Sequence, residues 1–215
     1  MRPGAVLFDC DGVIVDSEPA TFDLLIRDLA RHGLALTPEQ AAREFLGGTI
    51  QRCSERARAL GADLPLGWVN AFYERLYARL AQGTALVAGI EQVLDALDAA
   101  GIPYAVGSNG APRKMQVTLG QHPRVWARLQ ARLFSGQVLG RLKPAPDLYL
   151  HAAAALGVPP ARCVVVEDSP TGARAAAAAG MVCWGYAPHG DAAALVAEGA
   201  RPFADMAALP RLLGL

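Results

Sequence analysis

The amino-acid sequence predicts an α/β fold, a doubly wound parallel sheet, with a helical segment inserted after the first strand. Short apolar runs alternate with helical patterns over most of the 215 residues. This succession is typical of parallel sheets with right-handed crossovers. Residues 16–84 interrupt it, because they show helical patterns only. The length of the chain suits a large core with a smaller module.

The first predicted strand is an apolar run from Ala5 that ends in Asp9-Cys10-Asp11-Gly12. Strands that are almost continuously apolar are typical of parallel sheets covered on both faces. Gly12 lets the backbone turn where the two carboxylates emerge. Like charges this close need a cation, and Mg2+ is a hard cation that prefers oxygen ligands. The alternative is an acidic loop, since Asp-x-Asp-Gly also occurs in calcium loops and turns.

Residues 16–84 are predicted to form a module of four helices that pack on one another. Apolar residues at helical spacing and breaks at glycine define the four stretches. They are Glu18–Arg31, a helix that begins at Thr37-Pro38, Ile50–Leu60 and Trp68–Leu80.

Strand and helix patterns alternate again from residue 85 onwards. Four further apolar runs are predicted to be strands: Tyr104–Gly107, Leu133–Ser135, Cys163–Val166 and Val182–Gly185. Helical patterns lie around them: Glu91–Ala100, Pro112–Leu119, Pro146–Leu156 and Gly172–Ala179. We therefore predict a Rossmann-like core over residues 1–15 and 85–215 and a helical domain over residues 16–84.

The composition favours an ordinary globular protein. Hydrophobic residues make up 53% of the chain and the formal net charge is +0, so we expect neither a nucleic-acid partner nor an acidic tail. No apolar segment is long enough to cross a bilayer, and a first strand from Ala5 leaves no room for a signal peptide. The four cysteines favour a reducing cytoplasm over a disulfide framework, because they are scattered: Cys10, Cys53, Cys163 and Cys183.

Polar side chains follow four of the predicted strands, whose carboxyl ends meet at one edge of a parallel sheet. They are Asp9 and Asp11, Ser108 and Asn109, Lys143 in the loop 141–144, and Glu167 and Asp168. Four carboxylates in one crevice would be costly without partners. A metal ion bound by carboxylates, with an anion held by hydroxyl, lysine and backbone N–H groups, removes that cost. Phosphate is the anion that fits this description best.

Lysine is rare in this chain, and this gives Lys143 added weight. Only Lys114 and Lys143 are lysines among 20 basic residues. A lysine in such a chain is favoured where a compact, rotatable ammonium group is needed.

At this point the chain resembles the haloacid dehalogenase superfamily of phosphohydrolases. Four segments carry the resemblance in order: DCDGVIVDS, VGSNG, GRLKPAPDLY and VVVEDS. The helical insert is similar to the four-helix cap domain of the branch that includes β-phosphoglucomutase and the sugar-phosphate phosphatases. Four spaced motifs are far more specific than any one of them.

The resemblance assigns the chemistry to two aspartates. Asp9 would attack phosphorus as the nucleophile and form an aspartyl-phosphate. Asp11 would protonate the leaving alkoxide and then deprotonate the hydrolytic water. Dehalogenase members lack an aspartate at the position of Asp11, so the resemblance implies phosphoryl transfer.

The resemblance also implies a phosphate site and a metal site. Ser108 and Lys143 would bind the phosphoryl oxygens with help from Asn109. The implied ligands of a Mg2+ cofactor are Asp9, Asp11 through its main-chain carbonyl, Asp168, and Glu167 through water.

The implied activity is hydrolysis of a small phosphorylated metabolite by a cytoplasmic monomer. The substrate would be a sugar phosphate or a sugar-acid phosphate, because SNGAPRKMQVTLG and LFSGQVLGRLKPAPDLYLHAAAALGV are similar to phosphatases of the 6-phosphogluconate type. A β-phosphoglucomutase-type isomerase is the alternative, but residues 45–50 lack the basic side chains that would hold a second phosphate. A phospho-switch without turnover is a further alternative, against which Asp11 and the cap argue.

Some side chains stay open to more than one interpretation. Lys114 either faces the site or is solvated. Gly47-Gly48-Thr49 is a helix break or the cap loop that meets the substrate. Arg43, Arg52 and Arg75 are candidates for binding the distal part of a substrate.

Overall fold

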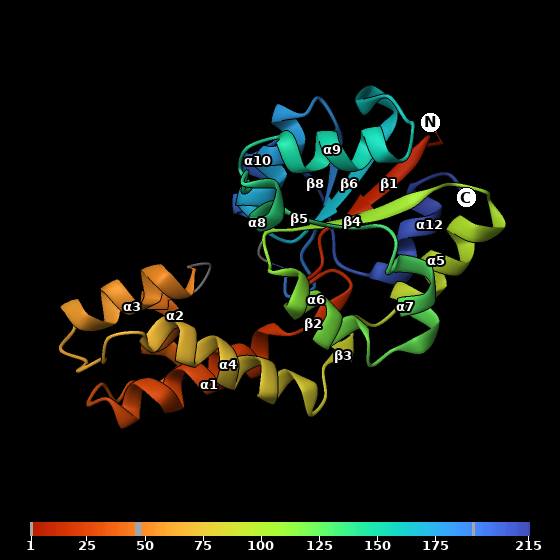
Figure 1. The fold of residues 1–215 in the computed structure, drawn as a ribbon. Helices are drawn as coiled ribbons and strands as arrows, with labels where there is room; N and C mark the ends of the chain where they lie inside the picture. The colour runs from red at the N-terminus through yellow and green to blue at the C-terminus, as the bar shows by residue number, and fades with distance from the viewer. Residues whose placement is uncertain (1, 46–48, 191) are drawn as a thin grey trace. The chain divides into compact units, whose positions relative to one another are not determined.

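The computed structural model describes residues 2–45, 49–190 and 192–215 (Figure 1). The chain forms two compact units. We call Met1–Asp16 with Ala85–Leu215 the core unit and Ser17–Thr84 the helical unit.

The core unit contains a six-stranded sheet in the order β5-β4-β1-β6-β7-β8, with every neighbouring pair parallel. The strands are β1 (Ala5–Phe8), β4 (Tyr104–Ser108), β5 (Leu133–Ser135), β6 (Cys163–Glu167), β7 (Val182–Tyr186) and β8 (Arg201–Phe203). From the central β1 the chain builds outwards first on one side and then on the other. The predicted doubly wound parallel sheet is confirmed, and its order reverses beside β1, where such sheets bind their ligands.

Helices cover both faces of the sheet (Figure 1). Alternate residues of β1 enter two different apolar clusters, Val6 and Phe8 one, Ala5 and Leu7 the other, as the two-residue period of a strand requires. The first cluster includes residues of α5 (Ile90–Ala99), α6 (Pro112–Leu119), α7 (Pro123–Leu129) and α12 (Leu209–Leu212). The second includes residues of α9 (Asp147–Ala155), α10 (Pro170–Ala178) and α11 (Ala193–Ala197).

Several short elements were not anticipated by the sequence patterns. They are β2 (Val15–Asp16), which pairs antiparallel with β3 (Ala85–Leu86), together with β8, α7, α8 (Gly136–Leu139), α11 and α12. β8 has the sequence Arg-Pro-Phe and lies at the sheet edge, where a proline costs no ladder hydrogen bond. The helix predicted from Gly172 begins at Pro170, because Ser169 caps it by accepting a bond from the Gly172 N–H at 3.0 Å.

The helical unit consists of α1 (Glu18–Arg31), α2 (Pro38–Phe45), α3 (Ile50–Ala59) and α4 (Trp68–Ala81). Its interior holds a buried charge, since Asp28 on α1 is 2% exposed. Asp28 Oδ2 accepts hydrogen bonds from Trp68 Nε1 at 2.7 Å and from Arg75 Nη2 at 2.9 Å. Arg75 therefore serves the packing of α1 on α4 within this unit, whereas Arg43 and Arg52 are exposed.

Among the residues that the structure describes, no helix is both long and apolar enough to cross a membrane. The four cysteines are free thiols and all are buried.

Candidate active site

The register of the three central strands brings the first site residues together. Phe8 lies opposite Val106 of β4 and Val166 of β6, so Asp9 emerges level with the ends of both neighbours. The Asp9 N–H continues the ladder by donating to Val166 O at 2.9 Å. Asp9, Ser108 and Glu167 thus lie together at the carboxyl ends of these strands, as predicted.

Lys143 is the cation at the centre of this edge. Its side chain is 3% exposed, and Nζ donates to Asp9 Oδ1 and, at 2.7 Å, to Glu167 Oε1. The loop that carries it does not follow β5 directly, because α8 lies between them. Ser135 caps α8 by accepting a bond from Val138 N at 3.5 Å.

Asn109 fixes the main chain of Lys143. Its Oδ1 accepts from the Lys143 N–H at 2.8 Å, and its Nδ2 donates to the Lys143 carbonyl at 3.2 Å. Both ends of the amide are therefore occupied in holding this loop. The neighbouring Ser108 hydroxyl accepts from Gly110 N at 2.9 Å.

Glu167 is completely buried and accepts five hydrogen bonds. Oε1 accepts from Lys143 Nζ and from Tyr149 OH at 2.8 Å. Oε2 accepts from the N–H groups of Asp168 and Ser169 at 3.1 Å and from Ser169 Oγ at 2.9 Å. A carboxylate has about four lone-pair positions, so these bonds use its full capacity. Gly172 is required beside it, because a β-carbon there would lie 1.7 Å from Oε1.

Burial and mutual charge together set the pKa values of Asp9, Lys143 and Glu167. Burial raises the pKa of Asp9 to about 7, and the nearby Glu167 and Asp11 carboxylates add to that rise against the opposing effect of Lys143. Burial alone would raise the pKa of Glu167 and lower that of Lys143. Their mutual attraction outweighs burial, so the pKa of Glu167 lies below its ordinary value and that of Lys143 above.

Asp11 belongs to a second ion pair, with Lys114 of α6. Lys114 Nζ is 2.8 Å from Asp11 Oδ1, and the two side chains are 18% and 22% exposed. Burial opposes the charge of Lys114, but Asp11 outweighs it and raises the pKa of the lysine. The structure thus decides between the two interpretations of Lys114, which faces the site.

Asp168 lies against the turn that follows the two aspartates. A β-carbon on Gly12, which has φ +81°, would lie 1.9 Å from Asp168 Oδ2. Only a glycine there lets this carboxylate approach the Asp9–Asp11 segment. In the described part of the chain, three His, Cys, Asp or Glu side chains do not come together as a preformed metal site. The candidate donors are the carboxylates of Asp9 and Asp168 and the main-chain carbonyl of Asp11. This set suits Mg2+, because the ion uses one or two carboxylates together with water and substrate phosphate.

Sequence reasoning missed two of the supporting side chains and left a third open. Tyr149 and Ser169 donate to Glu167 and lie within or beside the motifs, yet their residue types carry no charge that marks them. Lys114 had a usable signal in the scarcity of lysine.

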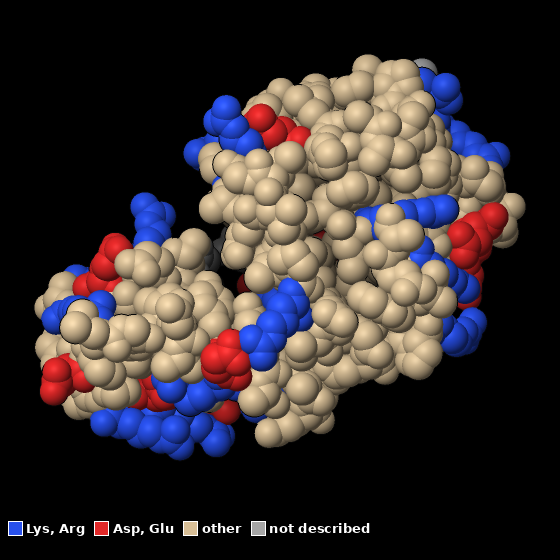
Figure 2. Space-filling view, in the orientation of Figure 1, with Lys and Arg blue, Asp and Glu red and all other residues tan. Residues whose placement is uncertain are grey.

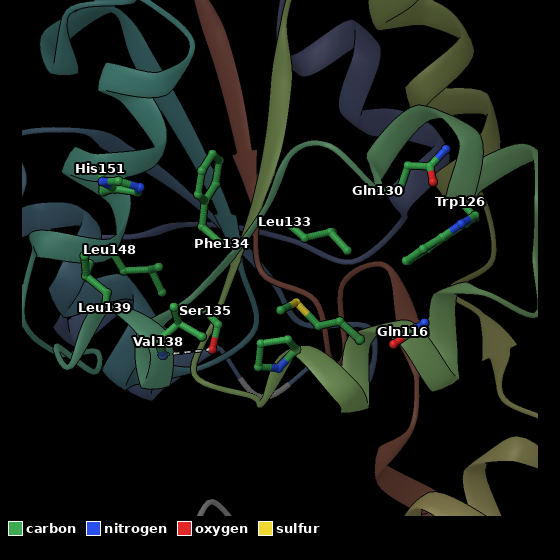
Figure 3. Close-up of a pocket in the computed structure, with 12 residues that line it drawn as sticks. Gln116, Trp126, Gln130, Leu133, Phe134, Ser135, Val138, Leu139, Leu148 and His151 are labelled. Atoms are coloured by element: carbon green, nitrogen blue, oxygen red, sulfur yellow. Dashed lines mark hydrogen bonds between the residues drawn. The ribbon is translucent and has the colours of Figure 1, made fainter.

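A cavity of about 500 Å³ lies beside β5, apart from these charged groups (Figure 3). Trp126, Leu133, Phe134 and Leu148 contribute to a lining that is mainly apolar. Its lining contains no Asp, Glu, Lys or Arg side chain. A phosphate dianion needs charged or N–H partners, so the strand-end cluster and not this cavity is the candidate active site.

Charged side chains are scattered over the visible face of the core unit in small groups of both signs, with wide uncharged areas between them (Figure 2). This distribution agrees with the formal net charge of +0.

The chain belongs to the haloacid dehalogenase-like hydrolases, whose family model matches residues 3–180. The resemblance drawn from the four motifs is thereby confirmed.

Named relatives narrow the class to phosphatases. The chain is 31% identical to 6-phosphogluconate phosphatase of Escherichia coli (strain K12) over 213 residues, which cover 98% of this chain and 95% of the relative. It is 34% identical to hexitol phosphatase A of the same organism over 183 residues, 84% of this chain and 81% of the relative. A solved HAD family hydrolase from Deinococcus radiodurans R1, with bound phosphate and sodium, is 34% identical with a TM-score of 0.81, covering 99% and 97% of the two chains. The protein is therefore a phosphatase of this family.

Proposed function

We propose that this phosphatase is Mg2+-dependent and hydrolyses the phosphate ester of a small sugar, sugar alcohol or sugar acid through an aspartyl-phosphate on Asp9. The observation that carries the proposal is the pairing of charges at the strand ends. Asp9 and Asp11 each face a lysine, which keeps two adjacent carboxylates at a site that must receive a phosphate.

In the first step, a carboxylate oxygen of Asp9 attacks phosphorus and the bond from phosphorus to the substrate oxygen breaks. Asp11 gives its proton to that oxygen, which leaves as an alcohol. Lys143 offsets the charge of Asp9 and, with the Ser108 hydroxyl, binds the phosphoryl oxygens as charge builds on them.

In the second step, water attacks the phosphorus of the aspartyl-phosphate. Asp11, now a carboxylate, takes the proton from that water, and the bond from phosphorus to Asp9 breaks. Inorganic phosphate and free Asp9 result, so atoms and protons balance over the two steps.

Asp9, Asp168 and the Asp11 carbonyl are the proposed metal ligands. A Mg2+ ion held by these residues would supply positive charge that stabilises the phosphoryl group. Glu167 completes the proposed set through water, and one of its five hydrogen bonds must then give way. Its contacts support a second task, which is to hold Lys143 and the Asp168-Ser169 turn in place.

The relatives support the substrate class. One relative is named for a sugar-acid phosphate and another for hexitol phosphates. We propose that the helical unit is the cap that selects among such substrates. The segment 46–48, which includes the proposed cap-loop glycines Gly47 and Gly48, lies outside the described residues.

The first test is phosphate release by the purified protein from a panel of sugar, hexitol and sugar-acid phosphates, with Mg2+ and with EDTA. Metal-dependent release that peaks on 6-phosphogluconate or a hexitol phosphate supports the proposal. Phosphate release that EDTA leaves unchanged contradicts the proposed metal dependence. Conversion of β-glucose 1-phosphate to glucose 6-phosphate without phosphate release supports a mutase instead.

A further inference from the structure

The ion pair between Lys114 and Asp11 is the counterpart of the pair between Lys143 and Asp9. The chain has only two lysines among 20 basic residues. Each of them contacts one of the two motif aspartates. Surface ion pairs contribute little because water competes for them, but here both partners are less than a quarter exposed.

Lys114 is held by a rigid element. It lies in the first turn of α6, where its N–H donates to Ala111 O at 2.9 Å and its carbonyl accepts from Thr118 Oγ1 at 3.0 Å. Met115, the next residue, is 2% exposed in the core. A group on a packed helix holds its partner more accurately than a group on a loop.

Three side chains converge on the bare Cα of Gly110. A β-carbon there would lie 3.1 Å from Ser108 Oγ, 3.7 Å from Lys114 Cδ and 3.8 Å from Asp11 Oδ2. Oδ1 of Asp11 meets the ammonium group, while Oδ2 lies on the side of Gly110 and Ser108. The ion pair thus fixes the Asp11 carboxylate beside the hydroxyl proposed to bind phosphoryl oxygens.

From this geometry we propose that Lys114 is a positioning residue: its ammonium group donates to Oδ1 of Asp11, so that Oδ2 carries the proton given to the leaving group and later accepts the proton of the hydrolytic water. Lys114 exchanges no proton with the substrate and acts only through Asp11. The inference rests on the proposed function, because it requires Asp11 to be the acid and base of the phosphatase.

The test compares Lys114→Met and Lys114→Arg with Asp11→Asn and with the control Arg113→Met, which removes a charge from the neighbouring residue of the same helix. Each protein is assayed with p-nitrophenyl phosphate for the burst of p-nitrophenolate and for steady-state turnover, and with a hexitol phosphate for turnover. p-Nitrophenolate leaves without a proton, so its burst reports attack by Asp9 without help from Asp11. The later turnover reports the water step, which needs Asp11.

We expect Lys114→Met to keep the burst while turnover of both substrates falls about 10- to 100-fold, the usual cost of removing a partner that orients a site residue. Asp11→Asn should show the same pattern more severely. Lys114→Arg should recover part of the turnover, since it restores the charge with a different shape, and Arg113→Met should behave like the wild type.

Wild-type turnover in Lys114→Met overturns the inference, and so does loss of its burst in parallel with turnover, because either result separates Lys114 from Asp11. Wild-type turnover in Asp11→Asn instead overturns the acid and base assignment in the proposed function, and the role of Lys114 with it.

Discussion

Two buried carboxylates, Glu167 in the core unit and Asp28 in the helical unit, have similar hydrogen-bond partners but differ in what those partners contact. Glu167 in the core unit accepts from a lysine and from a tyrosine hydroxyl. Asp28 in the helical unit accepts from an arginine and from a tryptophan N–H. Both residues are 2% exposed or less, so each needs its cation to offset the cost of burial.

The difference lies in what the cation does next. Lys143 Nζ donates to both Glu167 and Asp9 and so connects the buried acid to the proposed nucleophile. Arg75 contacts Asp28 through Nη2, and its buried Nε finds no partner among the described residues. The core pair is thus proposed to support a reaction, whereas the pair in the helical unit joins two helices. Substitutions at the two places should separate turnover from stability.

The largest effect on turnover is expected for Asp9→Asn, which replaces the proposed nucleophile. Turnover should fall by more than about 1,000-fold, because an amide cannot replace the carboxylate nucleophile. Lys143 keeps Glu167 as a partner, so no cation is left unpaired and the fold should persist. Phosphate release measures the first effect, and far-ultraviolet circular dichroism with a thermal melt checks the second. Near wild-type turnover would remove Asp9 as the nucleophile.

Asp28→Asn should have the opposite profile. It removes the charge that Arg75 requires, and the free energy of unfolding should fall by about 1 to 3 kcal/mol. The loss is smaller than for a fully buried pair, since the Arg75 side chain is 37% exposed and water can solvate it. Denaturant unfolding measures the loss, while turnover of p-nitrophenyl phosphate by the folded protein should stay near the wild-type value. A large fall in that turnover would break the comparison.

Two aromatic donors provide smaller changes, one in each unit. Tyr149→Phe deletes only the hydroxyl that donates to Glu167, whereas Trp68→Phe deletes the indole N–H that donates to Asp28 and also part of a buried ring. Tyr149→Phe should lower the free energy of unfolding by about 1 kcal/mol, and Trp68→Phe should lower it by more, because the smaller ring leaves a cavity. Only Tyr149→Phe should also lower turnover, by about tenfold, because it loosens the acid that holds Lys143. Equal turnover in the two variants would show that Glu167 needs no such support.

Five of the six strands of the parallel sheet and the charged residues were predictable from the sequence, since apolar runs mark these strands and motifs mark the charged residues. Asp9, Lys143 and Glu167 come together because parallel strands align their carboxyl ends, which sequence order alone indicates. Tyr149 could not be predicted, because its contact depends on where α9 packs against the sheet. The α7, α8, α11 and α12 segments are short helices of four to seven residues, so their apolar period is too brief to detect.

The pKa of Asp9 gives the smallest and most specific expectation. In the folded protein without metal it is about 7, against 3.8 as the ordinary value. Between these values the folded state holds a proton that the unfolded state has lost, so the stability of the metal-free protein should decrease as the pH rises through this window. Mg2+ needs the ionised carboxylate, and it competes with that proton.

The rise in melting temperature on adding Mg2+ should therefore be larger at pH 8 than at pH 6 for the wild type. Asp9→Asn carries no titratable group at this position, so its response to Mg2+ should be weak at both pH values. The same substitution in the helical unit, Asp28→Asn, should leave the pH dependence of the Mg2+ response intact, because Asp28 lies outside the proposed metal site. An equal response of the wild type at both pH values would mean that Asp9 does not bind the ion. The contacts among Asp9, Lys143 and Glu167 would then have only a structural role, like the contact between Asp28 and Arg75.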